Sequence, residues 1–174
     1  GISRGGFNDT NIILLEENII MMAGYPLKID FGSSIDSDKI EKGEFNILVK
    51  DHWTKKSILN EKIKETYFLI DIDTRENLST LWDVEININS LKKIKGTVKS
   101  ISLNSAKRKL FDQLKDKAIA ESKTDESTYQ IIFIESLRSS GLLANACYYL
   151  DLFIEANNNP QLINYKNHYT NSKN

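Results

Sequence analysis

Residues 80–88 read TLWDVEINI, and their side chains alternate between apolar and polar. A period of two is the pattern of a β-strand that buries one face and exposes the other. The apolar face is formed by Trp82, Val84, Ile86 and Ile88. We therefore expect a central strand of a sheet here, with Trp82 packed in the core.

Segments of the same kind lie on both sides of this strand, at residues 12–22, 27–31, 45–50, 68–72 and 94–103. The first is expected to break near Asn18, and Gly96 is expected to mark a β-bulge in the last. The lysine-rich segment 55–64 is at best a short edge strand, whose charge discourages edge pairing. About six or seven short strands without an intervening helix favour an antiparallel sandwich over residues 12–103. Residues 1–11 are expected to be a flexible lead-in.

After Leu103 the apolar residues recur at helical spacing instead. Three apolar faces are expected, formed by Leu110, Phe111, Leu114 and Ala118; by Tyr129, Ile132, Phe133 and Leu137; and by Leu143, Ala146, Leu150 and Phe153. Gly141 ends the second helix as a C′ glycine would, and Pro160 follows the third. The sequence therefore predicts an α+β chain, with a three-helix segment over residues 104–156 and a mobile tail over 157–174.

Composition narrows the classes of partner. The chain has 174 residues, a hydrophobic fraction of 40%, a charged fraction of 27% and a formal net charge of -1. Such a balance gives no general attraction to nucleic acid or to an anionic membrane, so we expect neither partner. No apolar run approaches the ~20 residues of a membrane span. The single cysteine excludes an intramolecular disulfide and a cysteine-rich zinc site.

The sequence contains few residues from which a catalytic site could be assembled. The sequence contains no phosphate-binding loop, no His-Glu-x-x-His and no Gly-x-Ser-x-Gly motif. Its two histidines are His52, expected in a solvated turn, and His168, in the tail. Cys147 is expected to pack as a small residue in a helix rather than to act as a nucleophile. We therefore expect no catalytic residue, no cofactor and no enzymatic activity.

The best candidate for a cation site is an acidic set on two strands, because calcium needs several converging oxygens. Its members are Asp71, Asp73, Asp83 and Glu85. In an immunoglobulin-like strand order these two strands belong to different sheets and their polar faces point apart. Solvated strand faces are therefore favoured over a metal site, and no metal ligand is expected.

Three aromatic residues are candidates for partner contact. Trp53 lies beside His52 at the end of a predicted strand, where its indole either contacts a partner or fills one end of the sandwich. Tyr148 and Tyr149 follow one another on the third helix, so that one is expected to pack inward and the other to be free for a partner.

Two motifs carry a resemblance to known proteins. The hairpin 128–156 resembles one tetratricopeptide repeat. The residues that match positions of that motif are Leu137, Gly141, Leu143, Ala146 and Leu150, whereas Phe153 stands where the motif usually has alanine. Together with Ile70-Asp71-Ile72, Leu81-Trp82-Asp83-Val84 and the strand from Gly96 to Leu103, the order of elements resembles a group of uncharacterised bacterial extracytoplasmic proteins. In these, an immunoglobulin- or fibronectin-III-like sandwich precedes such a hairpin. The resemblance covers residues 12–156 and implies architecture rather than activity.

These observations favour a non-catalytic protein-binding or assembly module of an exported bacterial protein, in the periplasm or on the cell surface. Because the sequence begins with Gly1 rather than Met, it is expected to be a processed or trimmed piece, which leaves room for a preceding signal peptide or anchor. Two alternatives stay open: a ligand- or metal-binding domain that uses the acidic strands, and a structural spacer domain of a larger envelope protein.

Overall fold

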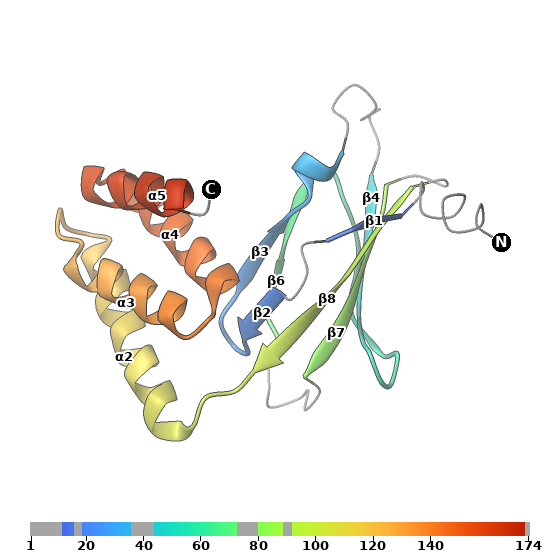
Figure 1. The fold of residues 1–174 in the computed structure, drawn as a ribbon, viewed down its shortest axis with the longest axis horizontal. Helices are drawn as coiled ribbons and strands as arrows, with labels where there is room; N and C mark the ends of the chain where they lie inside the picture. Colours follow the sequence, from blue (N-terminus) through green and yellow to red (C-terminus); the bar gives the residue numbers. More distant parts are fainter. Residues whose placement is uncertain (1–11, 16–18, 36–43, 73–79, 89–91, 173–174) are drawn as a thin grey trace.

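The computed structural model describes residues 12–15, 19–35, 44–72, 80–88 and 92–172. It is an α+β structure in which the β-strands lie on one side and the helices on the other (Figure 1). One six-stranded sheet contains β1 (Ile12–Leu14), β2 (Ile19–Met22), β4 (Phe45–Asp51), β5 (Ser57–Ile63), β7 (Leu81–Asn87) and β8 (Lys93–Ile101). A two-stranded sheet contains β3 (Leu27–Asp30) and β6 (Tyr67–Ile70).

The large sheet has the strand order β1-β8-β7-β4-β5, and β2 also pairs with β8. Both β1 and β2 run parallel to β8, whereas the pairs β7–β8, β4–β7 and β4–β5 are antiparallel. The sheet is therefore mixed, and the prediction of a purely antiparallel arrangement over residues 12–103 was wrong. The predicted division of the first segment into two strands is therefore confirmed, although Asn18 itself lies outside the described residues. The lysine-rich segment does form an edge strand, β5.

Gly96 does not mark a bulge in β8, because the pairing of β7 with β8 passes through Val84↔Gly96 without a shift of register. A Cβ atom at Gly96 would lie 2.6 Å from the Cβ of Leu15. The glycine is needed because Leu15, directly after β1, lies closely against β8 at this position. The prediction of a bulge here was wrong because a glycine within a strand is compatible both with a bulge and with the close approach of another segment.

The two sheets share one apolar core. Trp82, Val84 and Ile86 of β7 are buried in it, together with residues of β3 and β6. Trp82 is fully buried, and its Nε1 donates a hydrogen bond to the Oγ of Ser100, 3.2 Å away. The strand at residues 80–88 is thus central, as the alternation of its side chains predicts.

The helices are α2 (Ser105–Glu121), α3 (Thr128–Ser139), α4 (Leu143–Asn157) and α5 (Pro160–Ser172). The first three confirm the predicted helices; Asn104 caps α2 by accepting a hydrogen bond from the Lys107 amide at 2.9 Å. Gly141 adopts φ +79° between α3 and α4, a conformation that favours glycine.

The fourth helix corrects the prediction of a three-helix segment with a mobile tail over 157–174. Pro160 does not stop the helical region but begins α5, since proline is well tolerated at a first helical position. Asn159 precedes it, and its Oδ1 accepts a hydrogen bond from the Gln161 amide at 2.9 Å. Leu162 is fully buried in the helical core, which fastens α5 to the other helices.

Part of the predicted apolar faces is exposed. Phe111, Phe133 and Leu150 are buried as expected. The exposed members of the predicted faces are Leu110, Tyr129, Ile132 and Leu143. Each helix buries only the narrow stripe that meets its neighbours, so apolar residues at the margin of the stripe face solvent. Within the described part of the chain, none of the helices combines the length and apolarity that a bilayer span needs.

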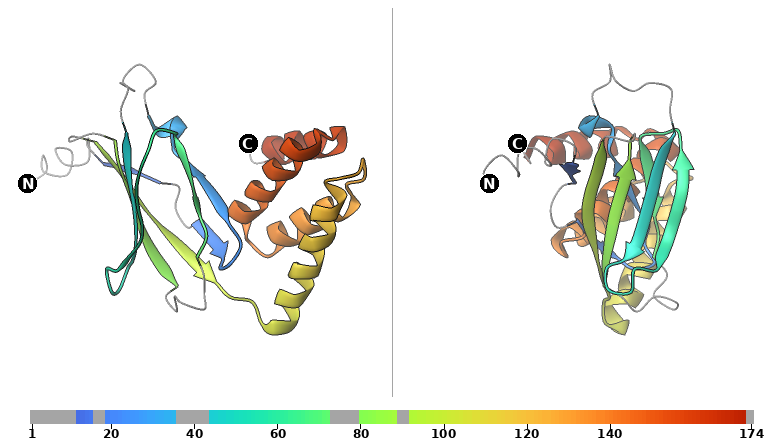
Figure 2. Two further views of the ribbon diagram at one scale, coloured as in Figure 1. Left: turned by 180° about the vertical axis from the view of Figure 1, so that it is seen from behind. Right: turned by 90° about the vertical axis from the view of Figure 1, so that its right-hand side faces the viewer.

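The helices are joined to the strands at the turn between β2 and β3. Asn145 of α4 is fully buried there, and its Oδ1 accepts a hydrogen bond from the Met22 amide at 2.8 Å. Its Nδ2 donates to the carbonyl oxygens of Tyr25, at 2.8 Å, and Pro26, at 3.1 Å. One side chain thereby satisfies three main-chain groups of the turn, and the start of α4 is fixed against β3 (Figure 2).

Tyr25 projects from the same turn into the helical core, where it is fully buried against the rings of Phe133 and Tyr149. Its hydroxyl donates a hydrogen bond of 2.6 Å to Oδ1 of Asp112, and burial raises the pKa of this hydroxyl well above its ordinary value. Burial of Asp112 opposes ionisation, but the bonds from Tyr25 and Arg108 outweigh it and lower the pKa of the carboxyl.

We expect Asn145→Ala to lower the free energy of unfolding by about 2–4 kcal/mol, because a buried polar group without its partner costs about 1–3 kcal/mol. Urea unfolding followed by circular dichroism measures this. Asn164→Ala, at an exposed position of α5, is the control and should stay within about 0.5 kcal/mol of the wild type. A loss below 1 kcal/mol at Asn145 would contradict the role given to it.

The Tyr25–Asp112 bond should make stability depend on pH. Because the pKa of Asp112 is lower in the folded chain, its contribution is present above the ordinary aspartate pKa of about 3.9 and is lost as the pH falls through the folded value. The stability difference between wild type and Asp112→Asn should therefore be constant from pH 7 to about 5 and shrink below about 4. Urea unfolding across this range measures it; a difference that grows in acid would contradict the assignment.

Candidate functional site

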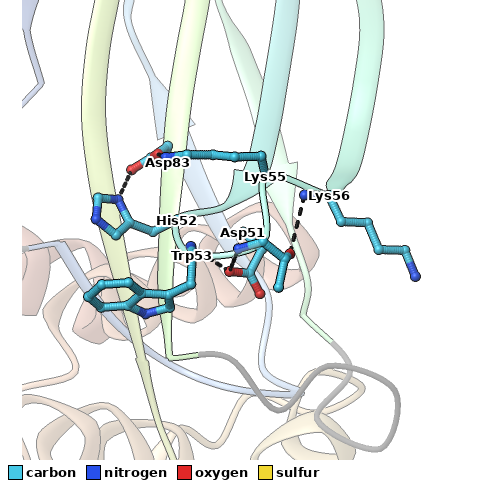
Figure 3. Close-up of polar contacts among 7 residues, drawn as sticks. Asp51, His52, Trp53, Lys55, Lys56 and Asp83 are labelled. Carbon is cyan, nitrogen blue, oxygen red and sulfur yellow. Dashed lines mark hydrogen bonds and ion pairs between the residues drawn. The ribbon is translucent and has the colours of Figure 1, made fainter.

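The turn between β4 and β5 presents the largest exposed aromatic side chain of the described residues. Asp51, at the end of β4, holds the turn by accepting hydrogen bonds at its Oδ1 from the amides of Trp53, at 2.8 Å, and Thr54, at 3.1 Å. Lys55 closes the turn: its φ is +65°, and its main-chain amide donates a hydrogen bond of 2.9 Å to the carbonyl oxygen of Asp51. The backbone that carries Trp53 is therefore fixed by the turn itself (Figure 3).

Trp53 is 71% exposed, which overturns the alternative in which its indole fills one end of the strand core. Its ring meets His52 edge to face, with ring centroids 4.7 Å apart. His52 is held in turn, because its Nδ1 lies 2.8 Å from Oδ1 of Asp83 on β7. The indole thus lies edge to face against a histidine that contacts Asp83, and most of its surface is exposed to solvent (Figure 3).

Two members of the acidic set, Asp83 and Glu85, lie in contact with basic side chains. Asp83 pairs with His52 and, at 3.5 Å, with Nζ of Lys55. Glu85 pairs with Nζ of Lys93 at 2.5 Å. Asp71 follows β6 in the other sheet, whereas Asp73 lies outside the described residues. Among the residues with described positions, no group of three or more potential metal-ligating histidine, cysteine or acidic side chains comes together.

Tyr149 is the member of the tyrosine pair that packs inward. It is 4% exposed and meets Phe133 with ring centroids 5.0 Å apart, and burial raises the pKa of its hydroxyl. The prediction of a partner contact at Tyr149 is therefore wrong, since α4 turns this residue into the helical core. Tyr148 is half-buried, with its ring edge-on to Tyr149 at 5.0 Å, and its partner contact stays a prediction.

Sequence reasoning missed a cavity of about 430 Å³ between β3 and the start of α4. Its walls include Leu15 and Ile19 from the N-terminal strands and Leu143 and Cys147 from α4. Cys147 is half-buried at this wall instead of fully packed. No local motif could have indicated the cavity, because its walls join residues 15–34 to residues 141–147, which are far away in the chain.

In comparisons with known proteins, no family model and no curated protein matches this chain. The geometry therefore has to be interpreted on its own terms. The structure has an exposed aromatic side chain on a fixed turn and a cavity beside a strand, and Asp83 and Glu85 of the large sheet form ion pairs with lysines.

We expect Asp51→Ala to loosen the turn and raise the mobility of the Trp53 indole. The variant loses two side-chain bonds to main-chain amides, whereas Asp51→Asn keeps an oxygen acceptor and should retain most of the order. The order parameter of the indole N–H, measured by ¹⁵N relaxation, should fall for the alanine variant at Trp53 and stay unchanged at the buried Trp82. Equal order in all three proteins would show that Asp51 does not fix the turn.

Proposed function

We propose that this chain is a non-catalytic protein-binding module and that Trp53 is the anchor of its contact surface. The observation that carries the proposal is a tryptophan that is 71% exposed on a turn held by Asp51 and supported by His52. Tryptophan is enriched among the residues that dominate protein interfaces, because a partner's pocket can desolvate its large ring. A fixed anchor also loses little conformational freedom on binding.

The charges around the indole fit the same role. His52 and Lys55 both contact Asp83, so the polar groups next to Trp53 already have partners. A protein that covers the indole would therefore not leave a buried charge unpaired at its edge. Surroundings of this kind form a polar rim around an apolar contact.

We further propose that the strands form an immunoglobulin-like sandwich. If β1 and β2 are counted as one divided first strand, the second and fifth strands pair in one sheet. The third, fourth, sixth and seventh strands pair in the other, in the order fourth-third-sixth-seventh. This division of strands supports the proposal, since it is typical of that architecture. The arrangement serves as a scaffold for binding turns and implies no chemistry.

The proposal keeps the chain outside the cytoplasm of a bacterium, on the strength of the resemblance to exported proteins of the same element order. The hairpin of α3 and α4 resembles a single tetratricopeptide unit, but Tyr149 and Phe153 bury its inner face against the other helices. The contact surface is therefore assigned to the β4–β5 turn rather than to this hairpin.

Photo-crosslinking tests this function. A photoreactive amino acid replaces Trp53 in one variant and Lys62, an exposed residue of β5, in the matched control. In cells of the source organism the variant at 53 should give a discrete protein adduct that the variant at 62 does not give. In a cell extract, excess wild-type chain should compete this adduct away, and Trp53→Ala should compete at least about tenfold less well.

Two results would overturn the proposal. Equal adducts from positions 53 and 62 would show non-specific proximity. Equal competition by wild type and Trp53→Ala would show that the indole is not the anchor, provided that circular dichroism confirms that the variant is folded.

A further inference from the structure

The cavity beside β3 follows the edge of that strand. Four successive residues, Leu27 to Asp30, contribute to its lining. Side chains of a strand point alternately to opposite faces, and here Leu27 and Ile29 point into the core whereas Lys28 and Asp30 are exposed. A cavity over one face would be lined by alternate residues only. Lining by both sets therefore indicates a groove that runs along the open edge of β3.

The main-chain groups of this edge can be assigned from the register. β3 pairs with β6 through Ile29↔Phe68. Two residues further along, the Phe31 amide donates a hydrogen bond of 2.9 Å to the Thr66 carbonyl oxygen, so Phe31 and Ile29 are the residues bonded to β6. In an antiparallel pair, residues alternate between those bonded to the neighbouring strand and those directed away from it. The amide and carbonyl groups of Lys28 and Asp30 therefore point away from β6, toward the groove.

No described strand occupies that side of β3. Within the described ranges β3 pairs with β6 alone, while β1 and β2 pair with β8. An open edge with main-chain donors and acceptors is a template for one more strand. Leu15 and Ile19 from the N-terminal segment and Leu143 and Cys147 from α4 contribute apolar side chains to the lining beside the position that such a strand would take.

We propose that this groove binds an extended peptide segment of a partner protein, which adds to β3 as an antiparallel strand. Binding by strand addition uses main-chain hydrogen bonds for affinity and alternate side chains for selectivity. This site is separate from the Trp53 turn and does not depend on the function proposed for it.

The side chains of β3 define the chemistry of the segment. Residues directly opposite each other on an antiparallel pair lie on the same face. A basic residue therefore fits opposite Asp30, an apolar one opposite Ile29 and an acidic one opposite Lys28. Read from its amino end, the segment has the order basic, apolar, acidic, apolar, and its apolar side chains enter between the walls of the groove.

The shape of the groove favours a peptide over the other occupants. A second copy of this chain would have to bring its own β3, which lies equally deep between its walls, into contact with this one. A small apolar molecule would fill the volume of about 430 Å³ but would leave the main-chain groups of Lys28 and Asp30 without partners. An extended segment satisfies these groups and has no walls of its own.

The test uses a fluorescein-labelled, end-capped peptide of the order serine, valine, arginine, valine, glutamate, valine, serine, with binding to the full chain followed by fluorescence polarisation. In the proposed register the amides of arginine and glutamate face β3, and those of the valines face away. N-methylation of arginine and glutamate should weaken binding by at least about tenfold, since each blocked amide loses a hydrogen bond. N-methylation of two valines is the matched control and should change affinity less than about threefold.

Lys28→Glu provides the test from the side of the protein. Wild type should prefer the peptide above to one with arginine in place of glutamate, and the variant should reverse this preference, by about threefold in each direction. Lys28 is exposed, so the substitution should leave the fold intact, which circular dichroism checks.

Three outcomes would overturn the proposal. One is the absence of saturable binding up to millimolar peptide. Another is binding that responds equally to both N-methylation patterns, as expected for a merely apolar site. The third is a concentration-dependent dimer in sedimentation velocity that Lys28→Glu dissociates, because the occupant would then be a second copy.

Discussion

Strand β2 separates two apolar cores, and this position ties the helices to the strands. Met21 is buried among the residues of the two sheets, and its neighbour Met22 is buried among the helices. Successive side chains of a strand point to opposite faces, and in β2 both faces are buried, one by the sheets and the other by the helices. Tyr25 extends the second contact by inserting its ring into the helical core. The helices therefore cover β2 as part of one structure, and the Asn145 bonds to the turn fix how far α4 reaches along β3.

Much of the fold could be predicted because it depends on local periodicity. The strand with Trp82 and the first three helices follow from alternation and from helical spacing, which neighbouring residues impose directly. The fourth helix was missed because Pro160 has two opposite meanings: it ends a helix when it follows one and begins a helix when a cap such as Asn159 precedes it. Only the burial of Leu162 decides between them, and burial is a property of the whole structure.

The candidate sites were harder to predict for the same reason. The sequence placed Trp53 in a turn but could not say whether its indole points in or out, since both directions are compatible with one strand end. The role of Asn145 could not be predicted, because a polar residue within a helix is ordinarily exposed. It is buried only because its side chain bonds to the turn between β2 and β3, which is distant in the sequence. The ion pairs of Asp83 likewise depend on the alignment of β4 beside β7.

One edge of β3 stays open because both N-terminal strands pair with β8 and neither pairs with β3. Between the pairs Leu14↔Lys95 and Ile19↔Val98, the N-terminal segment has two residues more than β8, and Gly96 lets Leu15 lie against β8 at the start of this excess. Both N-terminal strands thereby cover the edge of β8, the longest strand described. The edge of β3, a four-residue strand that carries Lys28 and Asp30, stays open and lines the groove. Charges and a short length discourage indiscriminate pairing, so the open edge of β3 is protected against segments that lack the complementary charges.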